Sequence, residues 1–427
     1  MWNVRATLIL FCLLIWAVCA HAQSLEGFFP AGVPGYGTEP GVTVRSRARP
    51  AFDPFGMRFD TVMLHPRLDQ TIGFDDNIFG GSSRRGAWEI RTQPSLLAVI
   101  DQSDFTLGGF ISADRTNYLG VPSQNRTDFN MFLGGTEHAG SDKITVAIGY
   151  LSGHEDRTAL DALPSDRPVG FEVFNARGSY ETKFSRVTLT PSIEMNDWHF
   201  ENTTVLGVPV NQAARDRVTL QGTVDVRYDW MTGRDVRVIS RMLDTEYTHA
   251  AVGVPSNNSR TWRTLAGVDY DGDTVWRYRL MVGFEVREAS SAAVAAQVTG
   301  AGEAEVIWQP SGLTTVTLRA VRGIADAAQA GLSNYTYNGG ELTLDHELYR
   351  NVLISGSVTV RQAHFNQTGG DQAGAGLGLG VTWLINRDLR LITTYNFDDV
   401  RNSHLPSGTV AGNYDRDLLL LTLRVGL

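Results

Sequence analysis

The sequence predicts an all-β protein, a transmembrane antiparallel β-barrel of about 18 strands. Three observations support this prediction: short turn signals recur along the chain, the runs between them alternate apolar and polar residues, and aromatic residues gather beside the turns. Because side chains in a strand alternate between two faces, such runs have one oily and one wet face. A closed barrel turns these faces toward lipid and water and pairs every backbone group between strands.

Short turns rich in Gly, Asn, Asp and Ser recur at intervals of roughly forty residues. They lie at 101–104, 139–142, 184–186, 231–234, 271–274, 310–312, 349–351 and 386–388. Between successive turns, two alternating runs are joined by a longer polar loop. The pattern therefore predicts hairpins with short periplasmic turns and longer extracellular loops.

The run from Arg217 to Trp230 shows the alternation most clearly. Its apolar and polar positions are Val218, Leu220, Gly222, Val224, Val226, Tyr228 and Trp230 against Thr219, Gln221, Thr223, Asp225, Arg227 and Asp229. A helix would place residues two apart on opposite sides and scatter these apolar atoms. The runs 276–287 and 352–360 follow the same rhythm, so we expect strands throughout.

Alternating runs begin near Phe59 and end at Leu427. An even number of strands leaves both chain ends on the periplasmic side, as is usual for bacterial barrels. The runs at 297–309 and 334–347 are weak, so about 16 strands remain an alternative to about 18. Either number makes the lumen too wide for side chains alone to fill.

Aromatic residues beside the short turns predict a periplasmic girdle at the level of the lipid headgroups. These residues are Trp230, Tyr270, Trp276, Trp308 and Trp383. A second group near the opposite strand ends predicts an outer girdle: Trp88, Tyr118, Phe129, Tyr150, Tyr247, Trp262, Tyr395 and Phe397. A soluble β-sandwich is the alternative, but its core aromatics would gather in the middle of the strands.

Residues 1–22 are predicted to be a secretory signal peptide. Arg5 precedes an apolar run that ends at Ala20, and cleavage is expected near Ala22; a retained anchor or a lipoprotein attached at Cys19 is a weaker alternative. Cleavage would remove both cysteines, Cys12 and Cys19, and with them any disulfide. No later run could form an apolar membrane helix of about twenty residues. We therefore expect a barrel in the bacterial outer membrane.

Residues 23–58 precede the predicted barrel at 59–427 and form a leader rich in proline and glycine. Proline removes the N–H groups that strand pairing needs, so this leader is expected to lie in the periplasm or enter the mouth of the barrel. With few apolar residues to pack, a loose leader is favoured over a plug of the lumen.

The composition excludes several classes of function. A formal charge of −9 without long runs of one sign argues against nucleic acid as a partner. The chain contains no G-x-x-x-x-G-K, H-E-x-x-H or C-x-x-C motif, and its histidines are scattered, so we expect no enzyme, metal or cofactor. Asp75, Asp76 and Asn77 resemble a fragment of a calcium loop, but a role in capping a turn is favoured.

Charged residues on the polar faces are predicted to line the lumen, because each would cost several kcal/mol on the lipid face near the midplane. These candidates are Glu194, Asp225, Arg227, Asp229, Arg277, Arg279, Glu285, Arg287, Asp345 and Glu347. For any one of them, a solvated wall residue is an alternative to a specific binding role. The loops 154–170 and 202–215 are long enough to fold inward and narrow the lumen.

The segment 56–79 resembles the start of a family of outer-membrane β-barrel proteins of proteobacteria. In that family a Pro-x-Leu strand leads into a turn similar to Phe74-Asp75-Asp76-Asn77-Ile78, so Asp75, Asp76 and Asn77 form the matching fingerprint. The resemblance implies a porin-like barrel, and members are often associated with exopolysaccharide export. One departure is Leu427, because barrel proteins usually end in Phe or Trp.

These observations lead to a functional expectation with alternatives. The first is an outer-membrane channel that exports exopolysaccharide or a similar polar polymer, as the resemblance implies. A general diffusion porin for small hydrophilic solutes is the alternative, and an adhesin or purely structural barrel is a third class. The expected partners are outer-membrane lipid, the barrel insertion machinery and a periplasmic polysaccharide export protein.

Overall fold

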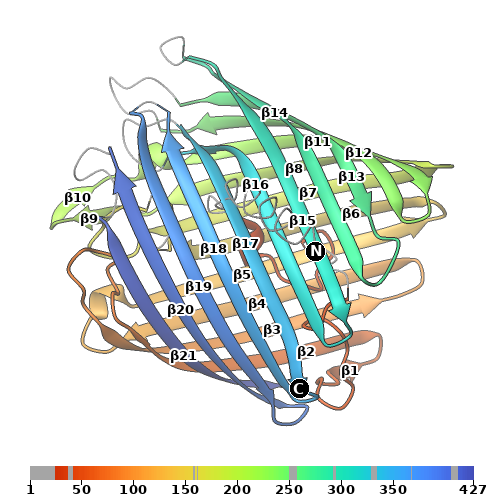
Figure 1. Cartoon of the computed structure of the whole chain (residues 1–427), viewed down its shortest axis with the longest axis horizontal. Helices are drawn as coiled ribbons and strands as arrows, with labels where there is room; N and C mark the ends of the chain where they lie inside the picture. Colours follow the sequence, from red (N-terminus) through yellow and green to blue (C-terminus); the bar gives the residue numbers. More distant parts are fainter. Residues whose placement is uncertain are drawn as a thin grey trace, which may run out of the picture.

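The computed structural model shows one continuous antiparallel sheet curled into a closed ring (Figure 1). It describes residues 25–36, 42–156, 159–160, 162–249, 257–291, 295–327, 334–366, 368–404 and 412–427. The predicted signal peptide, 1–22, lies outside the described residues. Among the residues described, no helix has the length and apolar character needed to cross a membrane.

The sheet contains 19 strands, of which β1 (Met57–Phe59) is a short extension and the other 18 form the ring. In chain order the ring strands are β2 (Val62–Asp75), β3 (Ala87–Asp101), β4 (Phe105–Tyr118), β5 (Arg126–Ala139), β6 (Asp142–His154), β7 (Gly170–Phe184), β8 (Val187–Phe200), β11 (Arg217–Met231), β12 (Arg234–Tyr247), β13 (Ser259–Tyr270), β14 (Trp276–Ala289), β15 (Gln297–Ser311), β16 (Thr314–Asp326), β17 (Asn334–Tyr349), β18 (Val352–Phe365), β19 (Gly370–Leu384), β20 (Leu389–Ser403) and β21 (Tyr414–Gly426).

Smaller elements lie in the connections. A separate hairpin of β9 (Thr203–Val205) and β10 (Val208–Val210) projects from the loop between β8 and β11 (Figure 1). Three short 3-10 helices are η1 (Leu25–Phe28), η2 (Pro122–Gln124) and η3 (Ala213–Arg215).

The ring closes where β2 pairs with β21, from Arg67 opposite Gly426 to Asp75 opposite Leu418. Each ring strand otherwise pairs with the next one along the chain. At the end of the barrel where β21 no longer pairs with β2, β1 pairs with β2 instead, with Met57 opposite Leu64. The lower part of β2 therefore has a pairing partner beyond the last residue of β21.

The predicted strand count and turns are confirmed. The ring has 18 strands, so the alternative of 16 is wrong, and the weak runs at 297–309 and 334–347 are the full strands β15 and β17. All eight predicted turns join neighbouring strands at one end of the barrel, which we call the short-turn end. The opposite, long-loop end carries the longer connections.

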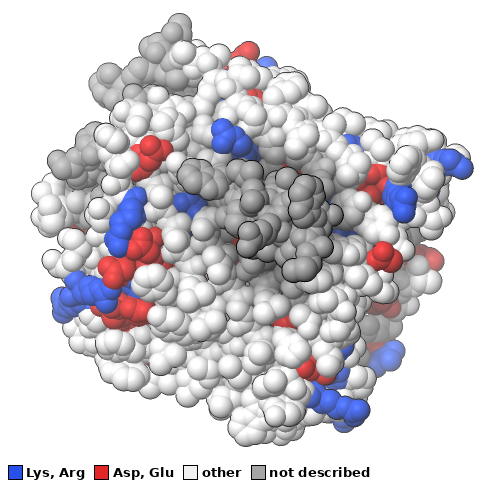
Figure 2. All heavy atoms as spheres, viewed as in Figure 1, with Lys and Arg blue, Asp and Glu red and all other residues white. Residues whose placement is uncertain are grey.

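The outer wall is apolar, as the alternation predicts. Val224, Val282 and Leu421 leave 47%, 72% and 42% of their surface uncovered by protein. Such exposure would be costly in water but suits contact with lipid. Figure 2 shows charged side chains in separate small groups on a largely uncharged surface.

The five aromatic residues predicted beside the short turns share the strand face of these apolar residues. Trp276 and Trp308 stack there, with ring centroids 5.5 Å apart. In the second group the structure corrects two assignments: Tyr118 and Tyr247 point into the barrel. Tyr118 is 6% exposed and shares its strand face with Asp114, which is 7% exposed.

Candidate functional site

The lumen wall is lined by ion pairs that cross between neighbouring strands. Of the predicted residues, Glu194 receives the Nη2 of Arg177 at 2.8 Å, and Asp225 accepts a hydrogen bond from the Nε of Arg237 at 2.8 Å. The Nε of Arg279 lies 2.9 Å from the Oδ2 of Asp269. Arg177 and Glu194, and Arg279 and Asp269, lie directly opposite each other across a strand pair, whereas Arg237 reaches Asp225 diagonally. Such contacts between opposite charges help fix the sheet register.

The remaining predicted wall residues are also placed by the structure. Asp229 receives the Nζ of Lys183 at 2.7 Å, and the Nε of Arg277 lies 2.7 Å from the Oδ1 of Asp271. Arg227 lies 3.7 Å from Asp235, and Arg287 forms an ion pair with Asp326. Glu285 accepts a hydrogen bond from the backbone N–H of Ile324 at 3.0 Å. Asp345 is partly buried opposite Thr315, and Glu347 forms an ion pair with Arg49 of the leader.

Sequence reasoning missed several members of this network. Arg237, Arg241, Arg263 and Glu303 lie on the same inward positions, and the Nη2 of Arg263 lies 3.2 Å from the Oε1 of Glu303. Each of them stands an even number of residues from other inward-facing positions of β12, β13 or β15, and this alternation could have identified them from the sequence. No group of three His, Cys, Asp or Glu side chains suited to hold a metal occurs among the described residues.

Residues 25–36 of the leader lie inside the barrel, and residues 42–56 lie at its short-turn end. Its Phe29 and Tyr36 rings pack on Phe132 of the inner wall, with centroids 5.8 and 4.7 Å from it. The Tyr36 hydroxyl donates to the Oδ1 of Asn175 at 2.8 Å. Burial raises the pKa of this hydroxyl, which therefore remains a neutral donor.

The lower part of the leader is attached at the short-turn end. The backbone N–H of Val44 donates to the Oγ1 of Thr315 at 3.0 Å. Glu347 receives Arg49 at 3.0 Å and also pairs with Arg47. Arg390 of β20 binds Asp53 at 2.9 Å. The packing thus corresponds to the predicted entry into the barrel mouth and disfavours the loose leader.

The loop 155–169 between β6 and β7 crosses the long-loop end. Its Leu160 packs on Tyr335, Ala363 and Phe365 of β17 and β18, which stand on the far side of the ring, and all four are buried. Asp166 ties the loop to the β9–β10 hairpin by accepting the N–H groups of Leu206 and Gly207. This loop narrows the lumen, whereas the loop 202–215 supports it from the side.

Replacing Leu160 with alanine is expected to loosen this crossing loop without unfolding the barrel. A buried Leu→Ala change in a well-packed site costs about 2–5 kcal/mol, and here the cost falls on one loop contact. Cleavage by proteinase K within residues 155–169 should become several-fold faster. Leu206→Ala is the control, because Leu206 is 90% exposed at the hairpin tip. Equal cleavage rates in both variants would contradict the role given to Leu160.

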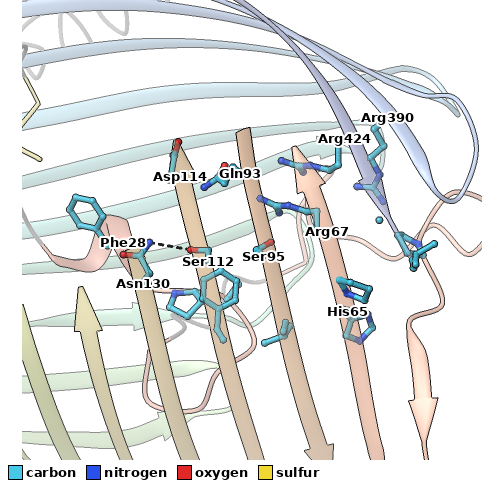
Figure 3. A pocket seen from close by; sticks show the side chains of 18 of the residues that line it. Phe28, His65, Arg67, Gln93, Ser95, Ser112, Asp114, Asn130, Arg390 and Arg424 are labelled. Atoms are coloured by element: carbon cyan, nitrogen blue, oxygen red, sulfur yellow. Dashed lines mark hydrogen bonds between the residues drawn. The ribbon is translucent and has the colours of Figure 1, made fainter. Parts of the chain in front are cut away.

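A cavity of about 630 Å³ opens within the lumen between the leader and the inner wall. It extends from Arg387 and Leu427 at the short-turn end up to Asp128 and Asn130 on β5. Figure 3 shows Arg67, Arg390 and Arg424 close together, with Gln93 and Ser95 on the adjacent strand β3 and Ser112 on β4. Five arginines and three aspartates line the cavity.

The fingerprint residues form a clasp across the closing seam between β2 and β21. Asp75, fully buried, accepts two hydrogen bonds from Arg416 of β21, at 3.0 and 2.6 Å. Asp76 accepts the backbone N–H of Asp417 at 2.7 Å, and Asn77 donates to the carbonyl of Asp415 at 3.0 Å. Asp75 also accepts the N–H of Asn77, the local cap that the sequence predicted.

A family model described as "Putative beta-barrel porin 2" matches residues 49–427, which include the clasp and the whole ring. The chain belongs to this porin family. With the closed apolar-walled barrel, this membership places the protein in the outer membrane, with the short-turn end facing the periplasm. Cleavage of the signal peptide remains a prediction.

Solved structures with a similar fold are distant in sequence. The outer membrane protein opdK from Pseudomonas aeruginosa is 12% identical with a TM-score of 0.45, over 85% of this chain and 99% of that one. OccAB3 of Acinetobacter baumannii is 10% identical with a TM-score of 0.46, over 86% and 100%. A bacterial polysaccharide outer membrane secretin is 9% identical with a TM-score of 0.38, over 85% and 98%. No curated protein matches the chain.

Proposed function

We propose that this porin conducts small hydrophilic solutes across the outer membrane, with a weak preference for anions and without chemical conversion of the solute. The observation that carries the proposal is the cavity, lined by five arginines and three aspartates, that opens at the periplasmic mouth and rises into the lumen beside the leader. Its volume of about 630 Å³ falls in the range of sites that hold a small molecule.

The contents of the lumen argue for small solutes. The leader packs on the inner wall at Phe132, and the loop 155–169 reaches the opposite wall at Tyr335. These two segments leave space beside them but no passage as wide as the bare ring. Selection by size therefore follows from the narrowest part of the path.

The charge of the cavity supports a weak anion preference. Its five arginines exceed its three aspartates, and Arg67, which is 40% exposed in its side chain, points into the free space. Arg67 and Arg424 share the single carboxylate of Asp69, at 3.2 and 2.8 Å, so positive charge exceeds negative charge at this part of the wall.

Arg67→Gln is expected to lower the ratio of anion to cation permeability while leaving the barrel folded. Asp69 keeps its partner in this variant, because Arg424 binds it through both guanidinium nitrogens at 2.9 and 2.8 Å. Reversal potentials in planar bilayers under a KCl gradient measure the ratio. Arg260→Gln is the control, because Arg260 lies on the outer face, paired with Asp244. An unchanged ratio in Arg67→Gln would refute the assigned selectivity.

Export of exopolysaccharide or a similar polar polymer is the second candidate, favoured by the resemblance of residues 56–79 to barrels associated with that process. It requires a periplasmic polysaccharide export protein as partner and a wider path than the cavity provides. Deleting the gene and comparing surface with periplasmic polysaccharide tests it. Unchanged surface polysaccharide would reject export, and liposome swelling with sugars of increasing size would then define the solute limit.

A further inference from the structure

We propose that residues 25–36 form a plug that blocks most of the lumen at rest, and that full conduction requires this segment to leave its seat on the inner wall. The inference rests on the proposed channel function and adds its regulation. The seat is the part of the inner wall that contacts the plug: Gly108, Phe132, Gly134, Ala147, Asn175 and Arg177.

The seat is shaped by small residues at the points where the plug backbone approaches. A Cβ atom added to Gly134 would lie 1.9 Å from the carbonyl oxygen of Pro34, and one added to Gly108 would lie 2.9 Å from that of Gly32. Both distances are shorter than atoms can approach. The wall therefore accommodates the plug only because these positions lack side chains.

Arg177 is the polar centre of the seat. Its Nη1 donates to the carbonyl of Gly35 at 2.8 Å, and its guanidinium carbon lies 4.4 Å from the ring centroid of Phe29 and 5.0 Å from that of Tyr36. These are cation–π interactions, in which the guanidinium is attracted to the faces of both aromatic rings. The plug thus covers a cation that would otherwise face the lumen.

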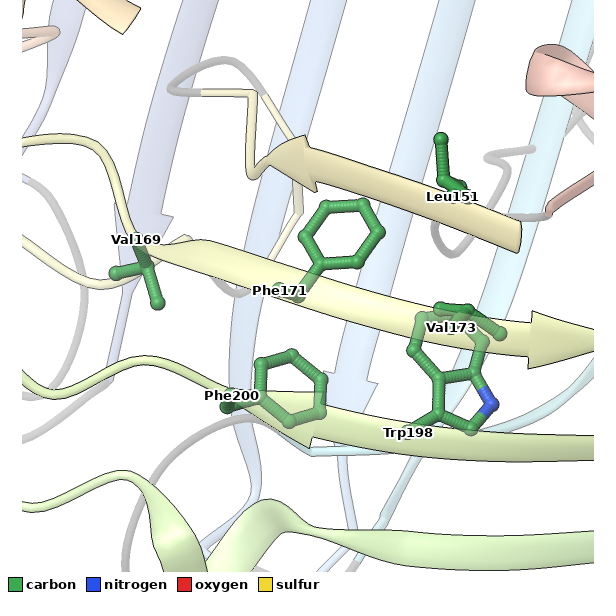
Figure 4. Packing of buried hydrophobic residues seen from close by; sticks show 6 residues of the cluster. All are labelled: Leu151, Val169, Phe171, Val173, Trp198 and Phe200. Atoms are coloured by element: carbon green, nitrogen blue, oxygen red, sulfur yellow. The ribbon is translucent and has the colours of Figure 1, made fainter. Parts of the chain in front are cut away.

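The upper end of the plug meets the crossing loop. Leu25 and Phe28 pack against an apolar cluster on the inner wall, which also receives Leu163 of the loop 155–169. Figure 4 shows this cluster, formed by Leu151, Val169, Phe171, Val173, Trp198 and Phe200. Plug and loop therefore narrow the lumen at the same level from two directions.

The attachment of the plug differs from that of the wall strands. Within the described residues, 25–36 join no strand, and their hydrogen bonds to the wall are those of Gly35 and Tyr36. Below them, Val44 and Arg49 hold the leader at Thr315 and Glu347. The plug can therefore leave its seat without breaking strand pairing, while the lower leader stays attached at the periplasmic mouth.

Gly134→Val tests the proposal from the wall side, because the added side chain occupies the place of Pro34 without altering the leader. Deletion of residues 25–36 tests it from the plug side and leaves every wall residue intact. Both variants are expected to show several-fold higher single-channel conductance than the parent in planar bilayers. Gly376→Ala is the control for an added side chain on the inner wall, because the nearest atom to a Cβ there is the Oδ1 of Asp398 at 3.3 Å, away from the plug.

A single cysteine reports the position of the plug independently of conductance. Val33 is 2% exposed and similar in size to cysteine. Val33→Cys should therefore react slowly with a water-soluble maleimide in the otherwise unchanged protein, and rapidly when it is combined with Gly134→Val. Rapid labelling with unchanged conductance would overturn the plug, as would rapid labelling already in the parent. A parent and variants that all fail to conduct while labelling shows displacement would instead refute the channel function on which the plug rests.

Discussion

Asp75→Ala is expected to cause the largest loss of stability among single substitutions at the seam, and to yield mostly unclosed barrel. The alanine leaves Arg416 without its carboxylate in a site where the Arg416 side chain is only 14% exposed. Removing one partner of a buried ion pair costs about 3–5 kcal/mol. Because no hairpin turn links β2 to β21, the seam depends on such contacts. Urea unfolding of detergent-folded protein measures the loss.

The paired replacement Asp75→Leu with Arg416→Leu separates the ion pair from the site around it. Replacing both members by apolar residues of similar volume is often neutral, because no buried charge is left alone. The double variant should therefore regain most of the stability that Asp75→Ala loses. A double variant as unstable as the single one would show that the clasp works through Asp76 and Asn77 instead.

Val224→Arg is expected to destabilise the folded barrel in lipid by about 2–4 kcal/mol, the cost of a charge on the lipid face near the midplane. Val224 stands in the middle of β11 (Arg217–Met231), with Thr223 and Asp225 facing inward beside it. Equilibrium unfolding in phospholipid vesicles gives the free energy. The substitution tests the orientation of the whole wall, since every strand shares the same alternation.

Gln221→Arg on the same strand is the control for this orientation. Gln221 lies on the inner face, where it lines a cavity beside Arg177 and Glu194. A new arginine there remains in contact with water and a carboxylate, so the change in stability should be within about 0.5 kcal/mol. Equal losses for Val224→Arg and Gln221→Arg would contradict the assignment of the two faces.

The fold was predictable because barrel geometry repeats one local rule along the chain. Alternation and short turns are set by neighbouring residues, so the turn at 231–234 and the strand before it could be read from sequence. The same rule, applied by parity, placed Asp225 and Arg279 on the inner face. Tyr118 and Tyr247 were misassigned because only their position at strand ends was considered. Their place in the alternation puts them on the inner face, which Tyr118 shares with Asp114 and Tyr247 with Thr245.

The contents of the lumen were not predictable in the same way. Proline and glycine in the leader disfavour strand pairing but do not indicate where the segment lies. The prediction of a loose leader used only its amino-acid composition. Phe29 and Tyr36 became informative only once Phe132 and Arg177 were placed opposite them. Leu160 likewise binds residues nearly two hundred positions away in a closed ring, a relation that local pattern does not contain.

The position of Leu25 near the extracellular mouth determines where foreign sequence can be added to this protein. A sequence fused directly to Leu25 would start from within the lumen, because Leu25 rests on the cluster around Phe171 and Trp198. A folded reporter fused ahead of it cannot share that space with the seated segment. Epitopes are better inserted at Leu206, where the β9–β10 hairpin extends into the surroundings of the cell.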